Sequence, residues 1–318
     1  MGVVVVTCRP SGSPALPGRG LRLTPPRTAL YSKDCDFQNE RTFQLVHIVV
    51  AIKQVPDTTQ VRIDPETNTL IREGVPSIIN PFDVHALEEG VRLKERYGGK
   101  VTLVSMGPPQ AKEALQKGLS LGGDGAVLLS DRAFGGADTL ATSFTLAEAV
   151  RRLGEQEPVD LVICGKQTID GDTAQVGPGI ARRLDLAQLT YVDQVVSVDE
   201  AARTITVRRK LEGAHEVVQA PLPALLTVVK EINEPRYAAL PDLIRALRSE
   251  ISVWTSADMG VDTTRTGLSG SPTKVRRIFA PPRRGGGEVL EGDRATVVAT
   301  VLDKLLAAGV IGAPGQET

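Results

Sequence analysis

A regular alternation between short apolar runs and longer amphipathic stretches constrains the fold of this chain most. The first convincing run, residues 46–53, is almost wholly apolar, as expected of a strand buried on both faces of a parallel sheet. Further strands are predicted at 100–106, 126–129, 159–164 and 224–229, and helices at 80–97, 110–121, 138–153 and 174–184. Because parallel strands need long crossovers, the pattern predicts an α/β protein with a doubly wound, mainly parallel sheet.

Between 191 and 218 the apolar period changes to two. The runs 195–198, 204–207 and 215–218 alternate apolar and polar residues, which predicts an antiparallel meander added to the sheet. A surface hairpin is expected from 61–64 and 69–72, because turn-forming residues separate them.

Both ends of the chain differ from this pattern. Residues 1–45 are rich in proline and basic residues, with no acid before Asp34, and so mimic a transit peptide; we favour a disordered extension or an early start codon. Residues 46–260 are predicted to form an α/β nucleotide-binding domain. Residues 261–318 are predicted to be a C-terminal arm, with a helix at about 293–308, that contacts a partner subunit; a plain linker is the alternative.

The composition argues against several classes of protein. Basic and acidic residues number 37 and 38, so no global field attracts nucleic acid. No apolar run reaches the roughly 18–20 residues that span a bilayer. Cys8, Cys35 and Cys164 lack CxxC spacing and the three histidines are scattered, so we expect no metal site, no disulfide framework and a cytoplasmic protein.

Ligands of open α/β sheets bind at the carboxyl ends of the strands. The segments 51–55, 80–83, 105–108 and 165–178 are expected to converge there. In the last, small residues precede a helix whose N-terminus offers free N–H groups to a phosphate, and Thr173 is placed to cap that helix or bind a phosphate oxygen.

Two carboxylates, Asp170 and Asp172, repel phosphate and fit ribose hydroxyls or helix capping better. An ordinary capped turn remains an alternative. The chain has no GxxxxGK[ST] loop, no GxGxxG after its first strand, and no legible Ser/His/Asp or Cys/His arrangement, which disfavours ATP hydrolysis, Rossmann-type dinucleotide binding and an independent catalytic site.

Four motifs together resemble the beta subunits of electron transfer flavoproteins. In order they are Val50-Ala51-Ile52-Lys53-Gln54-Val55-Pro56-Asp57, Asn80-Pro81-Phe82-Asp83, Gly165-Lys166-Gln167-Thr168-Ile169-Asp170-Gly171-Asp172-Thr173-Ala174-Gln175-Val176-Gly177-Pro178 and Asn233-Glu234-Pro235-Arg236-Tyr237. The likeness covers about 46–311. Several long motifs in register make a highly specific signal.

The resemblance implies a heterodimer with an alpha subunit that carries FAD. Its partners would be an acyl-CoA or other dehydrogenase and, as acceptor, ferredoxin, flavodoxin or a quinone oxidoreductase. In one branch of the family the beta subunit holds a structural AMP; in the electron-bifurcating branch it holds a second FAD that accepts a hydride from NADH. The segments 172–178 and 270–275 are similar to the bifurcating branch, and Ala174 replaces an asparagine of the AMP branch, so we expect FAD, with AMP as the alternative.

The resemblance also implies two sets of contact residues. The cofactor contacts carried over are Ala51, Asn80, Pro81, Phe82, Asp83, Met106, Asp170, Gly171, Asp172, Thr173, Ala174, Gln175, Val176 and Gly177. The contacts to partner dehydrogenases are Asn233, Glu234, Pro235, Arg236, Tyr237 and Leu240. The rival class is a stand-alone nucleotide-binding regulator of the universal-stress type, which shares the sheet but needs neither flavin nor partner.

Overall fold

The computed structural model describes residues 5–7, 47–57, 62–63, 70–71, 76–276 and 287–311. The chain divides into two compact units, Met1–Arg277 and Ile278–Thr318. The expectation for residues 1–45 lies outside the described residues, apart from a short strand at Val5–Thr7.

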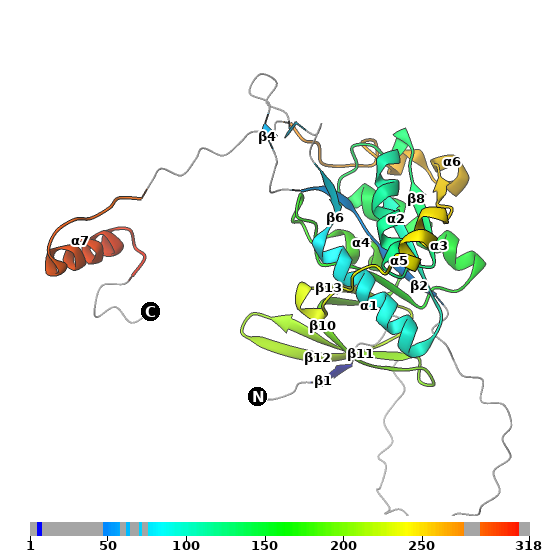
Figure 1. The fold of residues 1–318 in the computed structure, drawn as a ribbon, viewed down its shortest axis with the longest axis horizontal. Coiled ribbons are helices and arrows are strands. Elements are labelled where there is room, and N and C mark those ends of the chain that lie inside the picture. The colour runs from blue at the N-terminus through cyan, green and yellow to red at the C-terminus, as the bar shows by residue number, and fades with distance from the viewer. Residues whose placement is uncertain are drawn as a thin grey trace, which may run out of the picture. The chain divides into compact units, whose positions relative to one another are not determined.

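Within the described ranges, ten strands of the first unit form one sheet (Figure 1). Their bounds are β1 (Val5–Thr7), β2 (His47–Ala51), β7 (Lys100–Met106), β8 (Gly125–Leu129), β9 (Leu161–Gly165), β10 (Ala187–Asp199), β11 (Thr204–Leu211), β12 (Ala214–Pro221), β13 (Ala224–Val228) and β14 (Ser252–Trp254). The order is β1-β12-β11-β10-β13-β9-β2-β7-β8-β14, with β13, β9, β2, β7, β8 and β14 parallel to one another. The predicted mainly parallel sheet is confirmed.

Helices cover both faces of this sheet. They are α1 (Pro81–Tyr97), α2 (Lys112–Ser120), α3 (Thr139–Gln156), α4 (Val176–Leu184), α5 (Leu240–Arg248) and α6 (Ser256–Met259), with short 3-10 turns at Pro109–Ala111, Arg132–Phe134, Lys230–Ile232 and Thr263–Arg265. In β2, Ile48 and Val50 join the apolar cluster of α1 and α2, whereas Val49 joins that of α3 and α4. Successive strand residues point to opposite faces, which is why this strand reads as continuously apolar.

The meander differs from the prediction at its start. Strand β10 begins at Ala187 and runs parallel to β13 before it pairs antiparallel with β11. The change follows an irregularity between Leu189 and Val192, where Tyr191 has a φ of 58°. The irregularity interrupts the alternation of apolar residues, so the sequence reveals only the later part of the strand.

Two small antiparallel pairs lie outside the main sheet. One joins β3 (Gln54–Pro56) to β6 (Ser77–Ile79), just before α1. The other joins β4 (Arg62–Ile63) to β5 (Leu70–Ile71), which confirms the predicted hairpin.

The first part of the segment predicted as a C-terminal arm, residues 261–276, packs on the preceding domain. Thr266 and Ser271 are buried. Ser271 Oγ accepts a hydrogen bond from the backbone of Asp138 at 2.8 Å, and Thr273 Oγ1 donates one to the Asp138 carboxylate at 2.9 Å. The contacts are polar side-chain caps, which an apolar periodicity cannot reveal. The first compact unit includes the chain up to Arg277.

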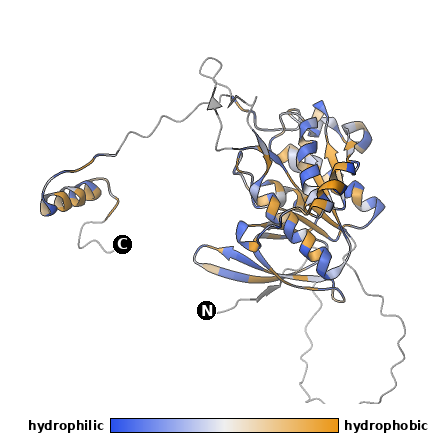
Figure 2. Ribbon diagram, in the orientation of Figure 1, coloured by the Kyte–Doolittle hydropathy of each residue, from blue (hydrophilic) through white to orange (hydrophobic). Residues whose placement is uncertain are grey.

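The second unit contains α7 (Arg294–Ala307), which confirms the predicted final helix. Asp293 caps it by accepting hydrogen bonds from the backbone of Ala295 and Thr296. Val298, Val301, Leu302 and Leu305 are exposed, and Figure 2 shows the apolar colouring along this helix. No helix in the described ranges is both long and apolar enough to cross a membrane.

Candidate functional site

Three predicted contacts share one neighbourhood at the carboxyl edge of the sheet. Ala51 and Met106 are the last residues of β2 and β7, and Val176 is the first residue of α4. All three are half-buried and pack against the same apolar cluster. The structure therefore brings these strand and helix ends together, as expected for a doubly wound sheet.

Asn80 fastens the long loop that follows β9. Its side chain is fully buried, donates to the carbonyl oxygen of Gln167 at 2.9 Å and accepts from the backbone N–H of Ile169 at 3.2 Å. Both ends of the amide are used within the protein. Asn80 thus holds the conformation of the loop through its side chain, and precedes α1 without a side-chain cap among the described residues.

Asp83 joins the ends of two neighbouring strands. Its carboxylate accepts hydrogen bonds from the backbone N–H groups of Lys53 at 2.8 Å and of Gly165 at 3.1 Å. Burial raises the pKa of Asp83 to about 7, against the opposing effect of hydrogen bonds from Asn80, Lys53 and Gly165. Asp83 therefore links the strand ends from which the loop after β9 begins, and its protonation state changes near neutral pH.

The segment 170–175 forms a bend with two left-handed residues. Asp172 has a φ of 52° and Ala174 a φ of 54°. Lys53 Nζ contacts Asp170 at 2.7 Å, and Gln167 Nε2 donates to Asp172 at 2.7 Å. Left-handed conformations cost side-chain-bearing residues about 1–2 kcal/mol each, and such strain concentrates at functional sites.

Helix α4 begins at Val176, two residues later than predicted. Its N-cap is Gln175, and no described side chain caps it, so Thr173 is not the cap. Gly177 lies against the sheet: a Cβ there would be 2.6 Å from Thr227 Cγ2 and 2.8 Å from Cys164 Sγ. The N-terminal amides of α4 are therefore held at the strand ends and have no side-chain partner from the cap.

The remaining predicted residues lie at the start of α1 or within the bend. Pro81 is the first residue of α1, and the Phe82 ring lies 4.9 Å from Lys230 Nζ. Gly171 and Thr173 are exposed within the bend. No group of three or more potential metal ligands occurs among the described residues.

The predicted contact residues leave out several residues that shape the site. Lys53 pairs with Asp170, and Thr139 Oγ1 donates to Gln175 at 3.0 Å. Gly165 allows Asp83 to approach, because a Cβ there would lie 2.4 Å from the Asp83 carboxylate. The available signal was position: Lys53 follows a buried strand, and Gly165 ends one.

The predicted partner loop contains both internal and exposed residues. Asn233 and Arg236 hydrogen-bond to α1. Tyr237 is 98% exposed and Leu240 69%. These two side chains are therefore the large apolar ones that the loop presents to solvent.

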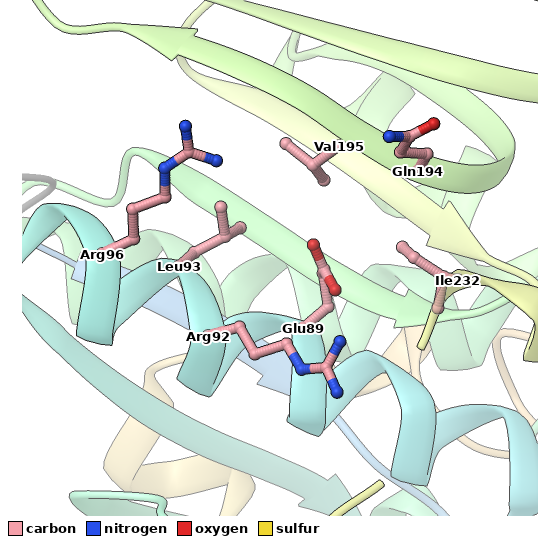
Figure 3. A pocket seen from close by; sticks show the side chains of 7 residues that line it. All are labelled: Glu89, Arg92, Leu93, Arg96, Gln194, Val195 and Ile232. Atoms are coloured by element: carbon pink, nitrogen blue, oxygen red, sulfur yellow. The ribbon is translucent and has the colours of Figure 1, made fainter. Parts of the chain in front are cut away.

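A hollow of about 220 Å³ lies between α1 and β10, apart from the predicted cofactor residues (Figure 3). Its lining residues are Glu89, Arg92, Leu93, Arg96, Gln194, Val195 and Ile232. Burial raises the pKa of Glu89, whose carboxylate accepts a hydrogen bond from Asn233 at 3.0 Å. The hollow thus lies beside the start of the partner loop.

The sheet, its two helical layers and the strained bend at its carboxyl edge define a doubly wound α/β protein. Residues 67–259 match the electron transfer flavoprotein domain. The chain belongs to the electron transfer flavoprotein family, on the side of its beta subunits, and its role is electron transfer. These matches argue against the alternative prediction, a stand-alone regulator of the universal-stress type.

Similar proteins agree with this assignment. The chain is 54% identical over 248 residues to Protein FixA of Azotobacter vinelandii, covering 77% of this chain and 88% of that protein. It is 51% identical over 275 residues to Protein FixA of Rhizobium leguminosarum bv. phaseoli, covering 86% and 98%. It is 52% identical over 260 residues to the electron transfer flavoprotein subunit beta of Clostridium acetobutylicum, covering 82% and 98%.

Proposed function

We propose that this chain is the beta subunit of a cytoplasmic heterodimer with a flavin-carrying alpha subunit. The complex carries electrons between NADH or dehydrogenases and acceptors such as ferredoxin, flavodoxin or a quinone oxidoreductase. The match to a protein named subunit beta supports this, because such a name belongs to a multi-subunit assembly.

The observation that carries the proposal is the bend at 170–175 and the helix that follows it. Two left-handed residues turn the chain so that α4 starts at the strand ends, with its first N–H groups free of a side-chain cap from Gln175. Such N–H groups and the helix dipole bind phosphate. The chain's own residues would hold a nucleotide diphosphate here, and a bound flavin would supply the redox chemistry.

Ala174 favours FAD over AMP as that nucleotide. Asparagine adopts the left-handed conformation more readily than alanine, which here has a φ of 54°. Alanine therefore adds local strain but leaves more room, which the isoalloxazine ring needs and AMP does not. Electron bifurcation from NADH follows from FAD in this subunit; structural AMP without bifurcation is the alternative.

Two exposed surfaces fit the proposed partners. Tyr237 and Leu240 provide a small apolar anchor for a dehydrogenase. The apolar residues of α7 remain exposed within their own unit and suit burial by the alpha subunit.

The test is the flavin content of the coexpressed heterodimer. We expect two flavins per heterodimer and bleaching of the visible spectrum by NADH. One flavin with AMP released on denaturation would reject bifurcation but keep the beta-subunit assignment. A colourless chain that binds neither alpha subunit nor flavin would reject both.

A further inference from the structure

The loop that contains Asn233 and Arg236 is fastened along α1 rather than free. Asn233 Nδ2 donates to the carbonyl oxygen of His85 and to the carboxylate of Glu89, both at 3.0 Å. Arg92 donates to the carbonyl oxygen of Glu234 at 3.0 Å. The loop backbone is thus held at its beginning by groups of one helix.

Arg236 closes this attachment with a forked ion pair. Its Nε donates to Glu88 at 2.8 Å, while Nη1 and Nη2 donate to the two oxygens of Glu95 at 2.6 Å and 3.0 Å. Its backbone N–H also donates to Glu88, at 3.2 Å. The side chain of Glu88 is only 4% exposed and receives a further hydrogen bond from Arg92.

The charges of this cluster are mutually satisfied. Burial of Glu88 favours its neutral form, but hydrogen bonds from Arg236 and Arg92 hold its pKa below the usual range. The hydrogen bond from Arg236 likewise lowers the pKa of Glu95. The planar guanidinium therefore uses its donors within the protein, whereas the apolar side chains of Tyr237 and Leu240 that follow it are exposed.

We propose that Arg236 is a positioning residue: its fork between Glu88 and Glu95 fixes the loop so that Tyr237 and Leu240 meet a partner dehydrogenase in one preformed conformation. The proposal rests on the proposed docking function of this loop. A preformed loop loses little freedom on binding, whereas a loosened loop must order several side chains, which weakens affinity by about tenfold.

The experiment uses the complete heterodimer and an acyl-CoA dehydrogenase chosen because it reduces the wild-type complex. Arg236→Lys keeps the charge but cannot bind Glu88 and Glu95 together. Glu95→Gln weakens only the more exposed ion pair, the one between Arg236 and Glu95. Arg248→Ala removes an exposed positive charge at the end of α5 and is the matched control. Leu240→Ala tests whether the loop docks at all.

We expect Arg236→Lys to raise the KM for the heterodimer about tenfold with kcat unchanged, and to speed hydrogen exchange at residues 233–240. Glu95→Gln should give a smaller change of the same kind, and Arg248→Ala none in exchange. An unchanged KM and unchanged exchange in Arg236→Lys, with Leu240→Ala impaired, would overturn the positioning role alone. An unimpaired Leu240→Ala variant would overturn docking by this loop, and the inference with it.

Discussion

Replacing Gly177 by alanine tests how closely α4 must approach the sheet. The new Cβ would lie 2.6 Å from Thr227 Cγ2 and 2.8 Å from Cys164 Sγ. Both neighbours are buried residues of adjacent parallel strands, β13 and β9. Neither can turn away freely, so either α4 or the strand ends must move.

The magnitude follows from two opposed terms. Alanine is favoured over glycine in a helix by about 1 kcal/mol, whereas overpacking of a filled core costs about 1–3 kcal/mol. Two contacts well inside van der Waals distance place the cost near the upper value, so the net loss is about 2 kcal/mol. For a domain of this size that lowers Tm by roughly 4–8 °C.

The assay compares thermal unfolding and nucleotide content of the heterodimer. Gly125→Ala is the control, because a Cβ at that position meets no described atom within 4 Å. We expect Gly177→Ala to lower both Tm and bound nucleotide, since the displaced helix moves its N–H groups away from the ligand.

A rescue variant decides whether packing is the cause. Thr227→Ser removes the colliding Cγ2 but keeps the hydroxyl that accepts the N–H of Tyr191 at 3.2 Å. Combined with Cys164→Ala, it should show a favourable coupling of about 1 kcal/mol with Gly177→Ala. Equal stability of the Gly177 and Gly125 variants, or zero coupling, would refute the reasoning.

Three further predictions concern charged groups. The pKa of Asp83 is raised from 3.8 to about 7. The contribution of Asp83 to the free energy of unfolding therefore declines as the pH rises from about 4 to 7, by about 4 kcal/mol in total. Asp83→Asn should remove this pH dependence of the free energy of unfolding, measured with denaturant from about pH 4 to 8. Burial lowers the pKa of His47, so the free energy of unfolding falls as the pH drops below 6.5, the usual pKa of histidine. His47→Gln should reduce this loss of stability at acid pH, and an unchanged loss would contradict a role for His47. Lys53→Met breaks a partly exposed pair with Asp170, so stability should change by less than about 1 kcal/mol, while hydrogen exchange of residues 170–175 should rise.

The sequence predicts the layered fold well because a strand that is buried on both faces of the sheet is recognisable as a mainly apolar run. The runs that became β2, β7, β9 and β13 are mainly apolar, and the helices between them carry apolar stripes. Strand β14 and the packed segment 261–276 show no such run. Strand β14 is short, and Val253 is exposed.

The sequence predicts a candidate site at the carboxyl edge of the sheet, but it does not predict the hydrogen bonds within that site. Asn80 and Asp83 stand at the predicted edge, yet their side chains bind protein groups that lie 82 to 89 residues further along the chain or in another loop. Neither periodicity nor propensity encodes such tertiary hydrogen bonds. Arg236 shows the same limit, since its two carboxylate partners lie on a helix about 140 residues earlier.

Helix α1 contacts the core and both proposed binding surfaces. Leu87 and Val91 bury one stripe in the core, which fixes the helix against the sheet. Its first turn supplies Asp83, which accepts the N–H of Gly165 ahead of the proposed nucleotide loop, and Glu88 and Glu95 accept hydrogen bonds from Arg236 of the proposed partner loop. Both groups of contacts lie on one continuous helix of 17 residues. The proposed dehydrogenase anchor and the proposed nucleotide loop are therefore both attached to one helix.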